Sequence, residues 1–188
     1  MQQTFPGLLV AHAAQRPDAP AMREKAYGIW QTLSWSDLAA MVADLAGALH
    51  EAGLRRGEHV VVIGSNRPRL YATMLAAQSL GVTPVPLYQD AAGAECVFPI
   101  NNADIRFAIV EDQEQVDKML EIRAQCPQIS NIYFDNPRGM RNYEETGLSS
   151  LDDLLAAGKA FSQKNPSFFA DEVAKVTSSD VAAMFFTS

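Results

Sequence analysis

The feature that most constrains the fold is a short, uninterrupted apolar run between two amphipathic segments. The run from His59 to Ile63 is β-branched and lacks polar alternation, which is typical of a strand buried on both faces of a sheet. Helical spacing precedes it, on Leu38, Met41, Val42, Leu45 and Leu49. The order of helix and strand then repeats. Strands that alternate with helices through short loops favour a parallel sheet with helices on both faces, which is a three-layer α/β sandwich.

Capping and breaking residues locate the other elements. Besides 59–63, the expected sheet strands are 82–87, 105–110, 129–134 and a last buried strand at 181–186. Pro84 and Pro86 remove two hydrogen-bond donors, so the second of these strands is expected at an edge or in an irregular pairing. Two short strands are expected around a turn at Tyr27-Gly28, and 135–147 is expected to be a loop. The expected helices begin at or near Thr4, Ser34, Arg67, Ala94, Asp112, Ser150 and Phe168, and the one after Ser150 is expected to end at Gly158.

Composition excludes several classes of protein. The 188 residues are 48% apolar, which is ample for a core without disulfides. The formal net charge of -7 disfavours nucleic-acid binding, because no basic face neutralises phosphates. Cys96 and Cys126 have no metal-ligand spacing and are expected to be inert thiols in a reducing compartment. The start of the chain does not resemble a signal peptide, and its longest aliphatic run is too short to cross a bilayer. We therefore expect a cytoplasmic protein, and leave a peripheral membrane contact open.

Two polar segments follow expected strands. Ser65 to Pro68 lies between the most buried strand and a helix, where Arg67 or Asn66 could contact a phosphate or carboxylate. The alternative, a helix cap with a solvated arginine, is favoured on the sequence alone. Tyr88 to Asp90 has a similar position and is expected to be a loop. The acidic segment 111–118 is expected to be a solvated helix start with a capping role rather than a metal site. The three histidines are expected to be structural or exposed, and no metal ligand is expected among them.

Five segments, in their order and spacing, resemble the adenylate-forming superfamily of AMP-producing acyl-CoA ligases, luciferases and peptide-synthetase adenylation domains. They are 33–38 (LSWSDL), 54–60 (LRRGEHV), Asn66 with Pro68, 75–88 (LAAQSLGVTPVPLY) and 180–188 (DVAAMFFTS). The last resembles the lead-in to the phosphate loop T-S-G-T-T-G-x-P-K. Segments 85–88 and 111–118 are most similar to bacterial long-chain fatty acyl-CoA ligases.

The resemblance implies a two-step reaction that uses ATP, Mg²⁺ and coenzyme A. A fatty acid would become an acyl-adenylate and then a thioester. Thr187 and Ser188 are the only residues of the phosphate loop present, and the resemblance implies that they contact nucleotide phosphates. The loop's glycines and lysine, and the later catalytic motifs, are absent.

We therefore expect residues 1–188 to be the N-terminal subdomain fragment of an AMP-binding domain, with the rest of that domain and the C-terminal domain missing. The chain alone is expected to bind no cofactor, to be inactive, and to form homodimers through surface exposed by truncation. Two alternatives remain: another adenylating enzyme that acts on an amino acid or aromatic acid, and a non-enzymatic flavodoxin-like binding module.

Overall fold

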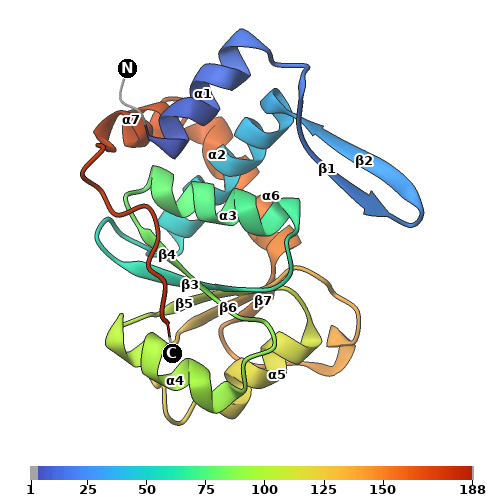
Figure 1. Ribbon diagram of the computed structural model, residues 1–188, viewed down its shortest axis with the longest axis vertical. Helices are drawn as coiled ribbons and strands as arrows, with labels where there is room; N and C mark the ends of the chain where they lie inside the picture. Colours follow the sequence, from blue (N-terminus) through green and yellow to red (C-terminus); the bar gives the residue numbers. More distant parts are fainter. Residues whose placement is uncertain (1–3, 188) are drawn as a thin grey trace.

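The computed structural model describes residues 4–187 and has three layers around a parallel sheet (Figure 1). The sheet has five strands in the order β4-β3-β5-β6-β7, and every neighbouring pair is parallel. This confirms the expected α/β sandwich. The strands are β3 (His59–Ile63), β4 (Thr83–Leu87), β5 (Phe107–Val110), β6 (Asn131–Phe134) and β7 (Leu148–Ser150).

Helices cover both faces of the sheet, as Figure 1 shows. Strand β3 explains why: Val60 and Val62 belong to one apolar core, and Val61 and Ile63 belong to the other. The first core contains residues from α2 (Trp35–Glu51), α3 (Pro68–Ser79) and α6 (Leu151–Lys164), and the second contains residues from α4 (Gly93–Asn102) and α5 (Gln113–Glu121). The outer helices α1 (Phe5–Gln15) and α7 (Phe168–Lys175) contact α2 and α3, and Met140–Asn142 form a short 3-10 helix.

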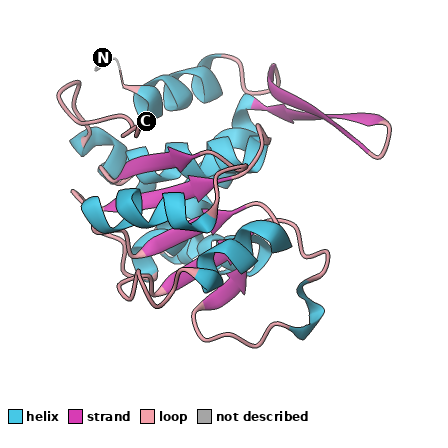
Figure 2. Ribbon diagram, turned by 60° about the horizontal axis from the view of Figure 1, so that its bottom comes forward, coloured by secondary structure: helices cyan, strands magenta, loops and turns pink. Residues whose placement is uncertain are grey.

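A hairpin of β1 (Pro20–Ala26) and β2 (Ile29–Ser34) extends from the body of the molecule, which Figure 2 also shows. Its turn at Tyr27-Gly28 is the expected one. At its base, the Ser34 side chain accepts a hydrogen bond from the Asp37 amide, and the Asp37 carboxylate accepts one from the Ser34 amide. This capping box starts α2 where the spacing of the sequence predicts it.

The predicted end of α6 at Gly158 is wrong. The helix continues to Lys164, and Gly158 is buried in its middle. A Cβ atom at this position would lie 2.0 Å from the carbonyl oxygen of Asp44 in α2. The glycine therefore permits close packing of two helices and does not terminate one.

The predicted buried strand at 181–186 is also wrong. The segment forms no strand, and Val181 and Phe185 are 61% and 71% exposed. It runs along the outer edge of β4, where the Met184 amide donates to the Pro84 carbonyl at 3.0 Å. Since Pro84 and Pro86 have no N–H to offer in return, a regular ladder cannot form there. The strand order places β4 at the edge of the sheet, which confirms the position that its two prolines predicted.

Two smaller features complete the fold. The three-residue strand β7 is not predicted by the sequence, which indicates a loop over 135–147 and a helix cap at Ser150. In the part of the chain that the structure describes, no helix is long and apolar enough to span a bilayer.

Candidate functional site

A crevice of about 600 Å³ lies at the carboxyl ends of β3 and β4. The chain leaves β3 toward α3 on one face of the sheet, and leaves β4 and β5 toward α4 and α5 on the other face. Because the loops after β3 and β4 leave toward opposite faces, a crevice opens between them at the carboxyl ends of the strands, the edge at which α/β proteins bind ligands. The structure thus brings together the two polar segments that the sequence singled out, Ser65-Asn66 and Tyr88 to Asp90, with Phe185 and Phe186 from the end of the chain.

An apolar pocket of about 300 Å³ adjoins this crevice. It shares Gly64 to Asn66, Pro86, Leu87 and Phe185 with the crevice. The remaining lining comes from β3 and α3 and is aliphatic or aromatic: Val62, Leu70, Tyr71 and Met74. Polar groups beside an apolar pocket suit a ligand that has a charged head and a hydrocarbon part.

Glu111 fixes the loop after β3. Its carboxylate accepts hydrogen bonds from the Ser65 amide at 2.5 Å and from the Ser65 hydroxyl at 2.7 Å. Burial opposes the ionisation of Glu111, but the bonds from Ser65 and the charge of Arg67 outweigh it, so its pKa lies below the ordinary value. A Cβ at Gly64 would lie 2.7 Å from the Glu111 Cβ, so only glycine admits this contact without displacement.

Arg67 lies away from the crevice that Asn66 lines. Its guanidinium pairs with Glu24 at 3.3 Å and with Glu111 at 3.4 Å, and it lines a second crevice of about 420 Å³ under the hairpin. The Asn66 side-chain oxygen accepts a hydrogen bond from the Tyr71 hydroxyl. Arg67 is therefore neither a simple solvated cation nor aimed at the first crevice.

The segment 111–118 is not a purely solvated face. Asp112 caps α5, as expected, by accepting from the Gln115 amide. Lys118, however, is buried and donates to the Gln89 carbonyl at 2.5 Å and to the Gln115 side chain at 2.8 Å. The buried lysine therefore holds the loop after β4 that lines the crevice.

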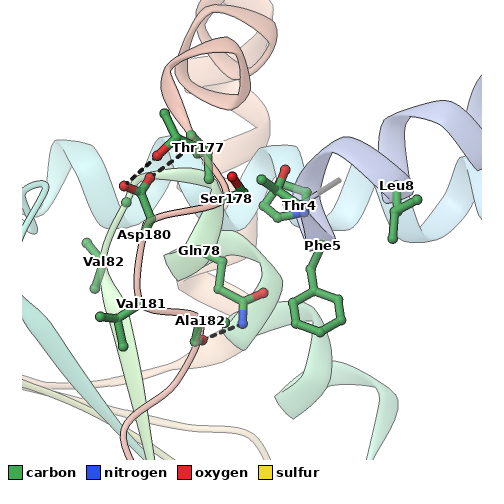
Figure 3. Close-up of a pocket in the computed structure, with 13 residues that line it drawn as sticks. Thr4, Phe5, Leu8, Gln78, Val82, Thr177, Ser178, Asp180, Val181 and Ala182 are labelled. Carbon is green, nitrogen blue, oxygen red and sulfur yellow. Dashed lines mark hydrogen bonds between the residues drawn. The ribbon is translucent and has the colours of Figure 1, made fainter. Parts of the chain in front are cut away.

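The C-terminal segment reaches the crevice along α3 and β4. Figure 3 shows Gln78 of α3 donating to the Ala182 carbonyl, a bond of 2.6 Å, beside a small crevice of about 150 Å³. Thr187 follows two residues that line the larger crevice and is exposed. Ser188 lies outside the described residues, and the phosphate-contact role of both residues stays a prediction.

The histidines and cysteines lie apart from this crevice. The His12 ring is tilted by 50° against the Trp35 ring, with ring centres 4.5 Å apart. The His50 ring centre lies 4.8 Å from that of Phe168, and burial lowers the pKa of His50. Cys96 and Cys126 are buried, and burial raises the pKa of both thiols, as inert cysteines require. Within residues 4–187, no group of three or more His, Cys, Asp or Glu side chains is arranged to hold a metal ion.

Residues 9–188 match the family model described as AMP-binding enzyme. The chain belongs to this AMP-binding enzyme family. Over 107 residues, the AMP-binding chain is 34% identical to "Uncharacterized protein Rv1549" of Mycobacterium tuberculosis, and the match covers 57% of this chain and 59% of that protein. Over 119 residues, it is 29% identical to the long-chain-fatty-acid–CoA ligase ACSBG2 of Mus musculus, a match that covers 63% of this chain and 18% of the ligase.

The fold of this AMP-binding chain also occurs in a solved structure. The anthranilate CoA ligase AuaEII, in complex with anthranoyl-AMP, superposes with a TM-score of 0.72 at 17% identity, over 82% of this chain and 28% of the ligase. The chain thus spans between about a fifth and three fifths of the length of these proteins. The family and fold that the sequence resemblance implied are confirmed.

Two residues that hold the loops of the crevice were not predicted to do so from the sequence. Glu111 and Lys118 are each distant in sequence from the loop that they hold, by 46 and 29 residues. One signal was available for Glu111, because it directly follows a strand that is apolar throughout. A carboxylate at such a strand end faces the loops of the neighbouring strands.

Proposed function

We propose that this chain is the N-terminal part of the AMP-binding domain of an AMP-forming acid–thiol ligase that activates a long-chain fatty acid. One observation carries the proposal: the crevice at the carboxyl ends of β3 and β4 is lined by two loops and by the C-terminal segment, whose sequence resembles the lead-in to a phosphate loop. The similarity to the mouse long-chain-fatty-acid–CoA ligase supports a fatty acid as substrate and coenzyme A as the thiol.

The reaction would proceed in two displacements. A carboxylate oxygen of the acid attacks the α-phosphorus of ATP, and pyrophosphate leaves. The thiolate of coenzyme A then attacks the acyl carbon, and AMP leaves. The protein's contribution to such steps is to position the reactants in line and to stabilise charge on the phosphoryl oxygens, together with Mg²⁺.

The residues around the crevice fit part of this task. The apolar pocket beside it offers room for a hydrocarbon part of the acid. Among the described residues that line the crevice there is no lysine or arginine, and Asp90 adds a negative charge. Neutralisation of a triphosphate therefore requires groups that follow Ser188 in a longer chain. We propose Thr187 and Ser188 as its first phosphate contacts.

The decisive experiment extends the coding sequence past codon 188 and purifies the product. A continuation with Gly-Thr-Thr-Gly, then two residues and a lysine, together with palmitate-dependent pyrophosphate release, would support the proposal. The 188-residue chain, assayed in parallel, is expected to release no more pyrophosphate than a heat-killed control. Release by the short chain would refute the assignment of the phosphate chemistry to later residues.

The choice of acid separates the proposal from its alternatives. Release that depends on an aromatic acid or an amino acid, with no response to palmitate, would favour another adenylating enzyme. A stop codon directly after Ser188 would favour a non-enzymatic binding module. The proposed cytoplasmic location would be tested by fractionation of cells that express the natural gene.

A further inference from the structure

The hairpin of β1 and β2 presents an unusual outer surface. It extends beyond the helices and the sheet in both Figure 1 and Figure 2. Three of the exposed large apolar side chains among residues 4–187 lie in its turn and in β2: Tyr27 is 102% exposed, Ile29 is 65% exposed and Trp30 is 60% exposed. Exposed aromatic groups that gather on one projecting element point to a contact outside the chain.

The two faces of the hairpin differ in chemistry. Opposed residues of an antiparallel pair share a face, and Lys25 lies opposite Trp30, while Arg23 lies opposite Thr32. The Arg23 guanidinium lies 5.7 Å from the centre of the Trp30 ring. The face toward the body instead carries Met22, which packs on the core, Glu24, which pairs with Arg67, and, beside the turn, Ile29, which lies opposite Ala26. The outer face is therefore basic and aromatic, although the whole chain has a net charge of -7.

The backbone of the turn is strained at its aromatic residue. Tyr27 has a φ of 52° and Gly28 a φ of 78°, both in the left-handed region. Two-residue turns of this kind favour Asn-Gly or Gly-Gly, because a bulky residue is strained there. A tyrosine that is fully exposed and strained contributes little to the stability of the chain, so a contact made by its ring accounts for its presence better than folding does.

We propose that the outer face and tip of this hairpin bind the anionic surface of a lipid bilayer. Aromatic rings and aliphatic side chains enter the boundary between headgroups and acyl chains, and Arg and Lys stems bury while their charges contact the headgroups. A nucleic acid fits this surface less well. Two cations neutralise few phosphates, and a duplex has no apolar boundary layer for the exposed rings to enter.

The Glu24–Arg67 pair gives this surface a fixed relation to the sheet. Arg67 also pairs with Glu111, which holds the loop that lines the larger crevice. The hairpin tip, Arg67 and Glu111 all line the second crevice. A bilayer bound by the hairpin therefore lies beside the edge of the sheet at which the loops after β3 and β5 lie. This inference does not depend on the proposed function, because it concerns binding and not turnover.

The test is co-sedimentation of the purified chain with vesicles of phosphatidylcholine, alone or mixed with phosphatidylserine. We expect binding to the mixed vesicles that weakens as salt is added. The double variant Arg23→Gln/Lys25→Gln should bind about 30-fold more weakly, since each cation near an anionic surface contributes about 1 kcal/mol. The matched control Lys159→Gln/Lys164→Gln makes the same charge change on exposed positions of α6 and should bind as the unchanged chain does.

Two further measurements distinguish insertion from nonspecific attraction. Trp30 emission should shift to shorter wavelength on binding, and Trp30→Phe should abolish that shift while Trp35 remains. Tyr27→Gly relieves the backbone strain, so it should fold at least as well and still bind more weakly. Absence of vesicle binding, equal loss in the α6 control, or binding to a duplex DNA in preference to vesicles would each overturn the proposal.

Discussion

Gly158 allows α6 to lie directly against the backbone of α2. A Cβ atom at position 158 would lie 2.0 Å from the Asp44 carbonyl oxygen. The backbone of α2 cannot move aside as a flexible side chain can. The same glycine misleads a prediction from sequence, because glycine in a helical pattern more often marks the end of a helix. Its role depends on a neighbour more than a hundred positions earlier, which local spacing does not reveal.

Gly158→Ala should therefore destabilise the chain, although alanine is the better helix former. We expect a loss of about 1–3 kcal/mol in the free energy of unfolding, as for other overpacked sites. Thermal and urea unfolding followed by circular dichroism would measure it. Ala157→Ser, at an exposed position on the same helix, is the control and should change stability by about 0.5 kcal/mol or less. An alanine variant as stable as the unchanged chain would show that α2 and α6 can separate freely.

Glu111 links stability to pH. Its pKa in the folded chain lies below the ordinary 4.5, so the folded state binds this proton less readily than the unfolded state does. The stabilisation is therefore present above about pH 4.5 and is lost as the pH falls through the folded-state pKa. The contribution of neighbouring Asp135 to stability depends on pH in the opposite direction, because burial raises the pKa of Asp135 despite its contact with Arg69.

Glu111→Gln should lower the free energy of unfolding by about 2 kcal/mol at pH 7, since hydrogen bonds to a charged group are lost. The difference from the unchanged chain should shrink as the pH falls below about 4.5. Urea unfolding from pH 7 to pH 3 would measure this. The Glu111 charge helps to raise the pKa of Asp135, so the same titration of Asp135→Asn measures the contribution of that second carboxyl separately. The exposed Glu114→Gln serves as control, for which we expect no such trend. A difference that stays constant with pH would contradict the role given to the carboxylate.

At the scale of elements, caps were predictable and distant pairings were not. Ser34, Asp112 and Ser150 each cap the helix that the sequence assigned to them, because a cap bonds to an amide three positions away. The prediction of a strand at 181–186 is wrong, since the apolar content of this segment indicates a strand while its pairing depends on the prolines of β4. Likewise, β7 is short and owes its pairing to β6, with Leu148 opposite Ile132.

Weak pairing predicts fast hydrogen exchange in the C-terminal segment. The Met184 amide has a partner in Pro84, and the Gln78 side chain holds the Ala182 carbonyl, but no ladder surrounds these bonds. Amides of residues 181–187 should exchange at least about 100-fold faster than those of β3, measured by mass spectrometry or NMR. Gln78→Ala should accelerate exchange further in 181–187 and leave β3 unchanged. Equal protection of both segments would indicate a regular strand after all.

At the scale of the whole molecule, the alternation of helix and strand predicted three layers and a parallel sheet correctly. The place of the crevice followed too, because polar segments after buried strands meet at one edge. The contacts that shape the crevice could not be predicted from the sequence. Ser65 bonds to Glu111 and Gln89 bonds to Lys118, and each pair joins two elements that are distant in sequence. Only the order of the strands in the sheet brings these elements together. A sequence pattern indicates whether a residue is buried, but it does not identify the residue that it contacts.

Association of chains stays a prediction. An apolar groove of about 510 Å³ lies between α1 and α7, and Val10 on its wall is 41% exposed. We expect light scattering to show a mass that rises with concentration, and Val10→Glu to reduce this rise because it places a charge in the groove. Gln163→Glu, which adds the same charge at an exposed position of α6, should have no effect. A constant monomer mass at high concentration would refute self-association.

The prolines of β4 also decide what can join the sheet. At positions 84 and 86 its outer side offers oxygen atoms only, so a neighbouring backbone must supply every hydrogen, as the Met184 amide does for the Pro84 carbonyl. Two copies of this strand brought together would present acceptors to acceptors and could not form a ladder. The sheet margin therefore accepts a segment that donates hydrogen bonds but not a second copy of β4, which guards the molecule against the edge-to-edge pairing that leads to fibrils.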